Sequence, residues 1–208
     1  MNPEIPIPTR EQAARILQVV DYGLVHGLGK PIPGEMCVEA AVCFALGLPH
    51  SDNPPCVGEE VRKCKIALND KSWTSDAARA KGMRAVAIAQ LGSNTIAQQA
   101  FKDLFWFKCG TQLQPLIGEY YAKGDKTSIY QAYADNMRAS TTLAECKTHA
   151  YDYGYAYDYD YSYAYSYAYG YGYGYGYGYD VWFTKVADIL LECLKELKSP
   201  GCQYLDLL

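Results

Sequence analysis

The first 150 residues of the chain alternate between segments with apolar residues at helical spacing and short segments rich in glycine and proline. After Thr9, apolar residues such as Ile16 and Val20 recur at spacings that place them on one face of a helix. Thr9 and Gln12 match the capping box with which many helices begin, and Gly27 can end the helix. We therefore predict a helix that starts after Thr9 and ends before Gly27.

The same spacing predicts six further helices, separated by turns rich in glycine, proline, asparagine and aspartate. The first of them is apolar on most sides, so we expect it near the centre of a bundle. The last lies close to the C-terminus and carries an apolar stripe of its own. The six predicted helices cover residues 35–46, 57–68, 76–91, 96–107, 127–149 and 181–197.

Charged residues within these helices are expected on their solvated faces. Three basic residues of the segment 76–91 are assigned to its outer side: Arg79, Lys81 and Arg84. Four glutamates near predicted helix starts are likewise interpreted as solvated and not as paired catalytic carboxylates: Glu35, Glu39, Glu59 and Glu60.

Residues 151–179 follow a different period, with tyrosine at every odd position and aspartate, glycine, alanine or serine at every even one. Side chains alternate between the two faces of a β-strand, so an extended chain would carry every tyrosine on one face. In a helix the tyrosines would point in all directions, and each interior glycine would cost about 1 kcal/mol relative to alanine. We call these residues the tyrosine tract and predict an extended conformation, with disorder as the alternative.

An extended strand leaves its backbone groups unpaired unless it folds back or pairs with another chain. Identical strands stacked about 4.7 Å apart would align the tyrosines in ladders. Asp152, Asp158 and Asp160 oppose such stacking because like charges repel, whereas the glycine-rich end of the tract is uncharged. We predict self-association through the tyrosines of the tract: Tyr151, Tyr153, Tyr155, Tyr157, Tyr159, Tyr161, Tyr163, Tyr165, Tyr167, Tyr169, Tyr171, Tyr173, Tyr175, Tyr177 and Tyr179.

The length, the net charge and the N-terminal sequence of the chain limit which classes of protein it can belong to. A chain of 208 residues can bury a sizeable core. Its net charge of −4 does not favour a general affinity for nucleic acid or anionic membranes. No signal-peptide pattern and no apolar run of membrane-spanning length is present. We expect a cytoplasmic protein, with unconventional export as the alternative. We expect no membrane contact and no cofactor, and the expected partner is a second copy of the same chain.

Eight cysteines allow several interpretations. We expect most of them to be reduced core residues, with disulfides in an exported form as the alternative. Cys37 lies near a predicted helix start, where the helix dipole would lower the thiol pKa, so a Cys-dependent enzyme with His26 or His50 is a further alternative. A zinc site is a further alternative, with Cys43, His50, Cys56 and Cys64 as its ligands. The spacing of these four residues matches no standard zinc-binding motif.

Four segments, at residues 34–41, 77–84, 88–92 and 199–207, together resemble an uncharacterised group of bacterial helical proteins. Proteins of that group carry a length-variable repeat of alanine and tyrosine just before their last helix. The resemblance implies a helical fold but no activity and no catalytic residues. The Tyr-Gly units of this chain depart from the alanine-rich repeat, and they favour an extended tract over a helical one.

These patterns together predict a mainly α-helical protein, a compact bundle with the tyrosine tract inserted. We divide the chain into a helical domain at 1–150, the tract at 151–180, and a C-terminal helix and tail at 181–208 that pack back on the helical domain. The predicted function is a non-enzymatic structural protein that self-associates through the tract into a filament or higher oligomer. The alternative is a cytoplasmic helical binding module, with a protein or nucleic-acid partner and the tract as spacer; a Cys-dependent enzyme comes third.

Overall fold

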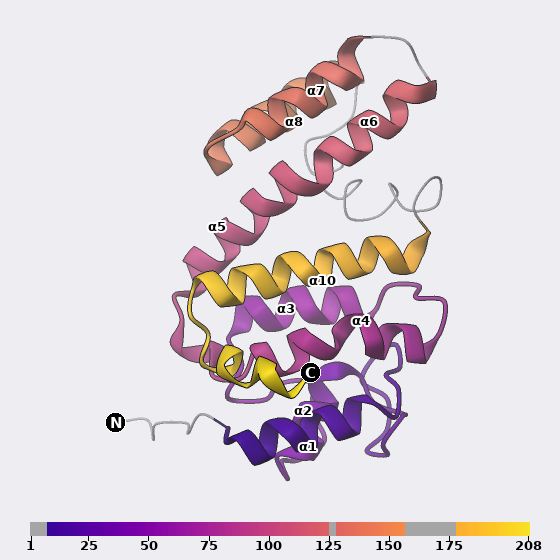
Figure 1. The fold of residues 1–208 in the computed structure, drawn as a ribbon, viewed down its shortest axis with the longest axis vertical. Coiled ribbons are helices and arrows are strands. Elements are labelled where there is room, and N and C mark those ends of the chain that lie inside the picture. Colours follow the sequence, from indigo (N-terminus) through magenta and orange to yellow (C-terminus); the bar gives the residue numbers. More distant parts are fainter. Residues whose placement is uncertain (1–7, 125–127, 157–177) are drawn as a thin grey trace. The chain divides into compact units, whose positions relative to one another are not determined.

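A computed structural model describes residues 8–124, 128–156 and 178–208 (Figure 1). Within these ranges the secondary structure is helical and contains no β-strand, which confirms the expected fold class. The α-helices are α1 (Arg10–Val20), α2 (Val38–Ala45), α3 (Glu59–Asn69), α4 (Asp76–Ala89), α5 (Gln98–Lys108), α6 (Gln114–Gly124), α7 (Ser128–Ala139), α8 (Leu143–Ala156) and α10 (Tyr179–Glu196). Shorter helices of other types are η1 (Ser93–Thr95), η2 (Cys109–Leu113) and η3 (Pro200–Leu207).

The segment 127–149, which we predicted as a single helix, is divided into α7 and α8, so that prediction is wrong. After α7, the Ser140 hydroxyl donates to the carbonyl of Asn136 at 3.0 Å. A capping box then begins α8: Glu145 N–H donates to Thr142 Oγ1, and Thr142 N–H donates to the Glu145 carboxylate, both at 3.2 Å. Serine and threonine favour such caps over helix interiors because their hydroxyls bond to the nearby backbone.

The described chain falls into two compact units. Unit 1 comprises Met1–Lys102 together with Tyr179–Leu208, and unit 2 comprises Asp103–Gly178. The chain passes from unit 1 to unit 2 within α5 and returns through the tyrosine tract. Unit 2 is therefore an insertion in unit 1, whereas the sequence had suggested one helical domain over residues 1–150.

Helix α2 lies in the core of unit 1, as its apolar composition predicts. Val38, Ala40, Ala41 and Val42 are all 0% exposed. The helix packs on α1, α3 and α4, so it has neighbours on several sides. A short apolar helix of this kind is stabilised by the burial of its side chains more than by its own backbone hydrogen bonds.

Helices α4 and α10 pack side by side and run parallel in unit 1 (Figure 1). Asp180, in the first turn of α10, is hydrogen-bonded to Thr74 just before α4, and the turn after α10 meets the end of α4. There the Ser199 hydroxyl donates to the carbonyl of Ala89 at 2.7 Å, and Gly201 N–H donates to the carbonyl of Leu91 at 2.6 Å. A Cβ at Gly201 would overlap the Ile88 carbonyl oxygen, so glycine is required for this approach.

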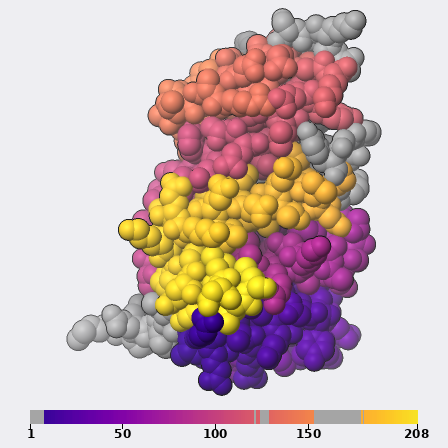
Figure 2. All heavy atoms as spheres, in the orientation of Figure 1, coloured from indigo at the N-terminus to yellow at the C-terminus, as the bar shows by residue number. Residues whose placement is uncertain are grey.

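The C-terminal helix η3 packs against α1 and α4. Arg10 forms a bidentate ion pair with Asp206, at 2.9 and 2.7 Å, and the Tyr204 hydroxyl donates to the carbonyl of Pro8 at 2.8 Å. Figure 2 shows the C-terminal residues, in yellow, against the N-terminal helix, in indigo. Unit 1 is thus closed by contacts between its first and last helices.

Unit 2 contains α6, α7 and α8 with η2. Gly118 of α6 lets α7 approach closely, because a Cβ there would meet the backbone of Tyr130 and the side chain of Ala134. Buried residues of α7 and α8 form its core: Tyr133, Met137 and Cys146, with Phe107 of α5, partly buried, packed against them. The Tyr133 hydroxyl is satisfied by Gln114 Oε1 at 2.7 Å.

Candidate functional site

The predicted self-association residues lie partly inside helices. Tyr151, Tyr153 and Tyr155 belong to the last turns of α8, and Tyr179 is the first residue of α10. The other tyrosines of the tract, at the odd positions from 157 to 177, lie outside the described residues. The structure therefore locates the two ends of the tract.

The extended conformation predicted for the first residues of the tract is wrong, because α8 continues through Ala156. Extending an existing helix is much less costly than starting one. Residues 151–156 also contain a single glycine, Gly154, so the penalty there is small. Tyr151 is 52% exposed in this helix.

Asp180, at the start of α10, fixes the C-terminal end of the tract on unit 1. Its carboxylate accepts hydrogen bonds from the backbone N–H of Thr74, at 2.9 Å, and from the Thr74 hydroxyl. Thr74 lies in the turn between α3 and α4. An acidic residue in the first turn also interacts favourably with the dipole of α10. Sequence reasoning missed this contact because the two residues are 106 positions apart.

Aromatic residues bury the beginning of α10 next to Asp180. Trp182 is 1% exposed, and the ring of Phe183 lies 5.1 Å from that of Trp73, centroid to centroid. The indole of Trp73 packs over Gly82, where a Cβ would overlap it. Full burial of a phenylalanine-sized side chain contributes about 1.5–3 kcal/mol. Apolar packing and the hydrogen bonds to Asp180 therefore together hold this end of the tract on unit 1.

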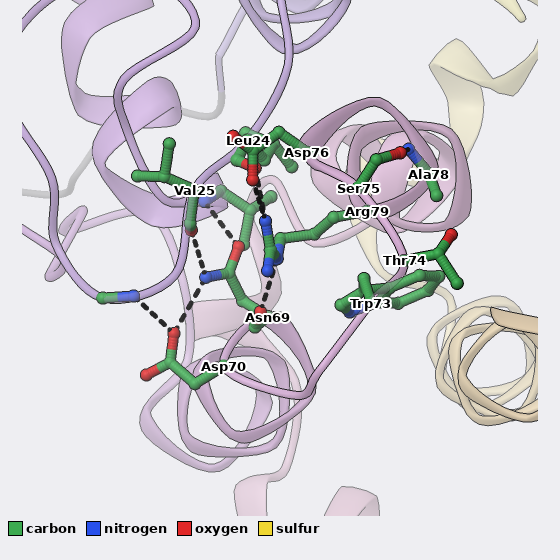
Figure 3. A network of polar contacts seen from close by, with 12 residues as sticks. Leu24, Val25, Asn69, Asp70, Trp73, Thr74, Ser75, Asp76, Ala78 and Arg79 are labelled. Atoms are coloured by element: carbon green, nitrogen blue, oxygen red, sulfur yellow. Dashed lines mark hydrogen bonds and ion pairs between the residues drawn. The ribbon is translucent and has the colours of Figure 1, made fainter. Parts of the chain in front are cut away.

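A network of polar groups joins the loop before α2 to the end of α3 (Figure 3). The side-chain amide of Asn69 donates to the carbonyl of Val25 at 2.9 Å, and its oxygen accepts the N–H of Val38 at 3.2 Å. The Asp70 carboxylate accepts the N–H of Gly27 at 2.8 Å. Side chains of α3 thus supply the hydrogen bonds that the irregular loop cannot make with itself.

Arg79 lies at the centre of this network, so the outward-facing position predicted for it is wrong (Figure 3). It is 5% exposed. Its guanidinium donates to the carbonyls of Asn69 at 2.8 Å and Leu24 at 2.6 Å, and to the carboxylate of Asp76 at 2.6 Å. Lys81, on the other side of α4, is exposed as predicted.

Glu39 and Lys65 form an ion pair in the interior of unit 1, which corrects the solvated position predicted for Glu39. Both side chains are 0% exposed, and Lys65 Nζ lies 3.0 Å from Glu39 Oε1. Glu39 belongs to α2 and Lys65 to α3, and Gln90, the buried C-cap residue of α4, interacts with the carboxylate. Three helices meet at this polar point. The sequence contained a signal, because Glu39 is the one charged residue of an otherwise apolar helix.

Burial shifts both members of this pair towards their neutral forms. Removal from solvent raises the pKa of Glu39 and lowers the pKa of Lys65, while the attraction between the two groups opposes each shift. In either its charged or its neutral form the pair holds one proton. It can therefore contribute to folding in the neutral range without a net uptake or release of protons.

Cys37 is the N-cap residue of α2, and its Sγ accepts the N–H of Ala40 at 3.4 Å. Burial raises the pKa of this thiol, which overturns the expectation that the helix dipole would lower it. His26 is exposed, and His50 Nε2 lies 3.1 Å from the carbonyl oxygen of Gly29. Among the described residues no hydrogen bond joins Cys37 to either histidine, so they do not form a nucleophile pair.

The cysteines fit the interpretation as core residues. Six are buried, Cys64 and Cys202 are partly exposed, and none forms a disulfide within the described part of the chain. Burial raises the pKa of Cys43 and of Cys64 to about 12. No group of three or more His, Cys, Asp or Glu side chains in the described ranges could hold a metal ion. The four candidate zinc ligands therefore do not come together as a site.

A small pocket lies beside Cys37, between the loop before α2 and the end of α3. Its volume is about 30 Å³. Pockets for small organic ligands measure about 300–1,000 Å³, so this one has space for water molecules only. Its lining residues are Gly27, Leu28, Cys37, Val38, Asp52, Ile66, Asn69 and Asp70.

Comparison of the chain with protein-family models, with curated proteins and with solved structures gave no match. The resemblance to a group of bacterial helical proteins therefore stays a prediction. In the part of the chain that the structure describes, the helices fall short of the length and apolar character that a membrane crossing requires.

Proposed function

We propose that this protein is a non-enzymatic structural protein that self-associates through the tyrosine tract into a filament or higher oligomer. The observation that carries this proposal is the unbroken alternation of tyrosine with small residues over 151–179. Main-chain pairing between copies would satisfy the backbone, and tyrosine stacking would add about 0.5–1.5 kcal/mol per aromatic pair. The proposal includes a cytoplasmic location, in which unpaired thiols stay reduced.

The two ends of the tract support this proposal, because each end belongs to a folded element. The capping box at Thr142 and Glu145 begins α8, which leads into the tract, and Asp180 and Trp182 hold the helix that follows. Folded units on both sides would decorate an assembly whose centre is the tract. The raised pKa of the buried Cys37 thiol does not favour a Cys-dependent enzyme.

The test compares the full-length protein with two variants. One lacks residues 157–177, and the other keeps the length but replaces each tyrosine at the odd positions of that range by serine. We expect ordered particles by cryo-electron microscopy, and fast-sedimenting species, from the full-length protein alone. Far-ultraviolet circular dichroism checks that the helices of all three proteins are intact. Particles of the same form from the serine variant would contradict the proposal.

A second candidate function is a helical binding module in which the tract is a spacer. The observation that favours it is that the tract joins the last helix of unit 2 to a helix of unit 1, as a linker would. Monodisperse full-length particles, together with a salt-dependent mobility shift on nucleic acid, would support this candidate. Monodisperse particles without a mobility shift would leave a protein as the remaining partner of such a binding module.

A further inference from the structure

The loop between α1 and α2 exposes apolar side chains at the surface of unit 1. Tyr22 is 73% exposed, Ile32 is 48% exposed and Leu28 is 42% exposed. Tyr22 lies beside the turn that carries Ile32, since a Cβ added at Gly34 would be 3.7 Å from the Tyr22 Cβ. Single exposed apolar residues are common, but several gathered in one loop are typical of a binding surface. We call Tyr22, Leu28 and Ile32 the loop patch.

Contacts with other elements and within the loop fix its conformation. Side chains at the end of α3 hold its first half, through the carbonyl of Val25 and the N–H of Gly27 (Figure 3). In its second half, Lys30 N–H donates to the Glu35 carbonyl at 2.6 Å, and the Lys30 ammonium pairs with the Glu35 carboxylate at 3.2 Å. Two prolines in this turn restrict the backbone further. A loop that is already ordered loses little conformational entropy when another segment binds to it.

The end of the tyrosine tract lies close to this loop within unit 1. Asp180 is hydrogen-bonded to Thr74. Two residues after Thr74, Asp76 lies against Gly23, where an added Cβ would be 3.8 Å from the Asp76 side chain. These contacts place the Cα of Tyr22 within about 26 Å of that of Asp180. Figure 1 shows the end of α1 and the beginning of α10 at the same side of unit 1. About eight residues of chain are enough to cover that distance.

We propose that the glycine-rich part of the tract, residues 169–177, docks through its tyrosines on the loop patch of its own chain. A tyrosine ring can cover apolar side chains while its hydroxyl stays in water. Residues 169–177 are all tyrosine or glycine, so docking removes no charge from solvent. The covalent connection at Asp180 gives these tyrosines an effective concentration of millimolar order at the loop, so that even a weak contact is populated.

Docking within one chain and pairing between chains use the same tyrosines, so the two compete. This competition rests on the proposed function, because only a tract that associates can be held back from association. The effective concentration within one chain is constant, whereas pairing between copies is favoured as the protein concentration rises. The loop patch therefore raises the concentration at which assembly begins, and a weakened patch lowers it.

The test measures whether the loop patch brings the tract close in the monomer. A full-length chain carries Lys30→Cys beside the patch and Gly172→Cys in the tract. Cys64→Ser and Cys202→Ser remove the partly exposed native thiols. A short bifunctional thiol crosslinker is added at low protein concentration, and the rate of closure within one chain is measured by peptide mass spectrometry.

The same rate is then measured after weakening the patch by Leu28→Ser together with Ile32→Ser. We expect closure to be several-fold slower in this variant. Both side chains are exposed, so the melting temperature should change little, and far-ultraviolet circular dichroism checks that the helices are intact. The matched control is Ile129→Ser in unit 2, which is 40% exposed and should leave the closure rate unchanged.

Equal closure rates with the intact and the weakened patch would refute docking. A crosslinked product between chains, in place of closure within one chain, would assign the docked tract to a neighbouring copy and overturn the intramolecular form. Sedimentation of the same variants without crosslinker measures assembly, which we expect to begin at a several-fold lower concentration when the patch is weakened. An unchanged concentration would refute the competition. Assembly with equal closure rates would refute docking and leave the filament, whereas slower closure without any assembly would support docking and refute the filament.

Discussion

Removal of one member of the Glu39–Lys65 pair should destabilise unit 1 more than removal of both. The side chains are 0% exposed and their charged atoms are 3.0 Å apart, so Lys65→Met leaves a carboxylate, and Glu39→Gln an ammonium, in the apolar interior. Breaking a buried pair in this way costs about 3–5 kcal/mol, out of the about 5–15 kcal/mol that stabilises a typical domain. The double variant with methionine at both positions leaves no buried charge, and we expect it to equal the wild type or to be more stable by about 1–4 kcal/mol.

The two single variants should respond to pH in opposite directions. In Lys65→Met, burial raises the pKa of Glu39, so folding takes up a proton and the free energy of unfolding falls as pH rises above about 4. In Glu39→Gln, burial lowers the pKa of Lys65, so folding releases a proton and the free energy of unfolding falls as pH drops below about 10. Each slope is at most about 1.4 kcal/mol per pH unit. In the wild type the pair holds one proton in the folded and in the unfolded protein. Its contribution to the free energy of unfolding therefore does not change between about pH 5 and 9.

Urea unfolding at pH 5, 7 and 9 measures these effects. In a Trp106→Phe background the fluorescence of Trp73 and Trp182 reports unit 1 alone, since Trp106 belongs to unit 2. The matched control is Lys63→Met on the same helix, whose side chain is 54% exposed; it should change stability by about 0.5 kcal/mol or less. Single variants that cost less than about 1 kcal/mol, or that shift in the same direction with pH, would refute the reasoning.

Three further predictions concern other parts of the molecule. Gly201→Ala should lower the melting temperature, at a cost of about 1–3 kcal/mol, because its Cβ overlaps a carbonyl at the end of α4; an unchanged melting temperature would contradict the close approach. Arg79→Met should cost about 2–4 kcal/mol in urea unfolding because it leaves buried carbonyls without donors, whereas Lys81→Met should be nearly neutral. Burial raises the pKa of Cys43 and of Cys64 to about 12, so iodoacetamide at pH 8 should alkylate both thiols much more slowly in the folded protein than in urea. Peptide mass spectrometry measures the two rates, and equal rates would place these thiols in solvent.

Helix existence could be predicted from the sequence where local signals agreed. Thr9 and Gln12 form the expected capping box at the start of α1, and the apolar segment that became α2 is buried as predicted. The break between α7 and α8 was missed because apolar residues continue through it at helical spacing. There the Thr142 cap, a local competition for backbone hydrogen bonds, outweighs the periodicity.

The buried polar groups could not be located from residue type alone. Charged residues are usually exposed, and that rule placed Glu39 and Arg79 in solvent. Each instead has a partner on another helix: Lys65 forms an ion pair with Glu39, and the carbonyl of Asn69 accepts from Arg79. Periodicity identifies which side of a helix is apolar, but it does not show which group on another helix lets a charge enter the core.

The topology of unit 1 also bears on the length of the tract. Because α4 and α10 run parallel, the chain must travel back from the end of one to the start of the other, and the tract is the last part of that return. Doubling a flexible connection costs only about 0.6 kcal/mol in closure entropy, whereas burial of aromatic residues such as Phe183 contributes about 1.5–3 kcal/mol each. The fold of unit 1 can therefore tolerate added or lost Tyr-x units. If the tract pairs between copies, as we propose, a change in the number of Tyr-x units would alter association while the folded unit stays the same.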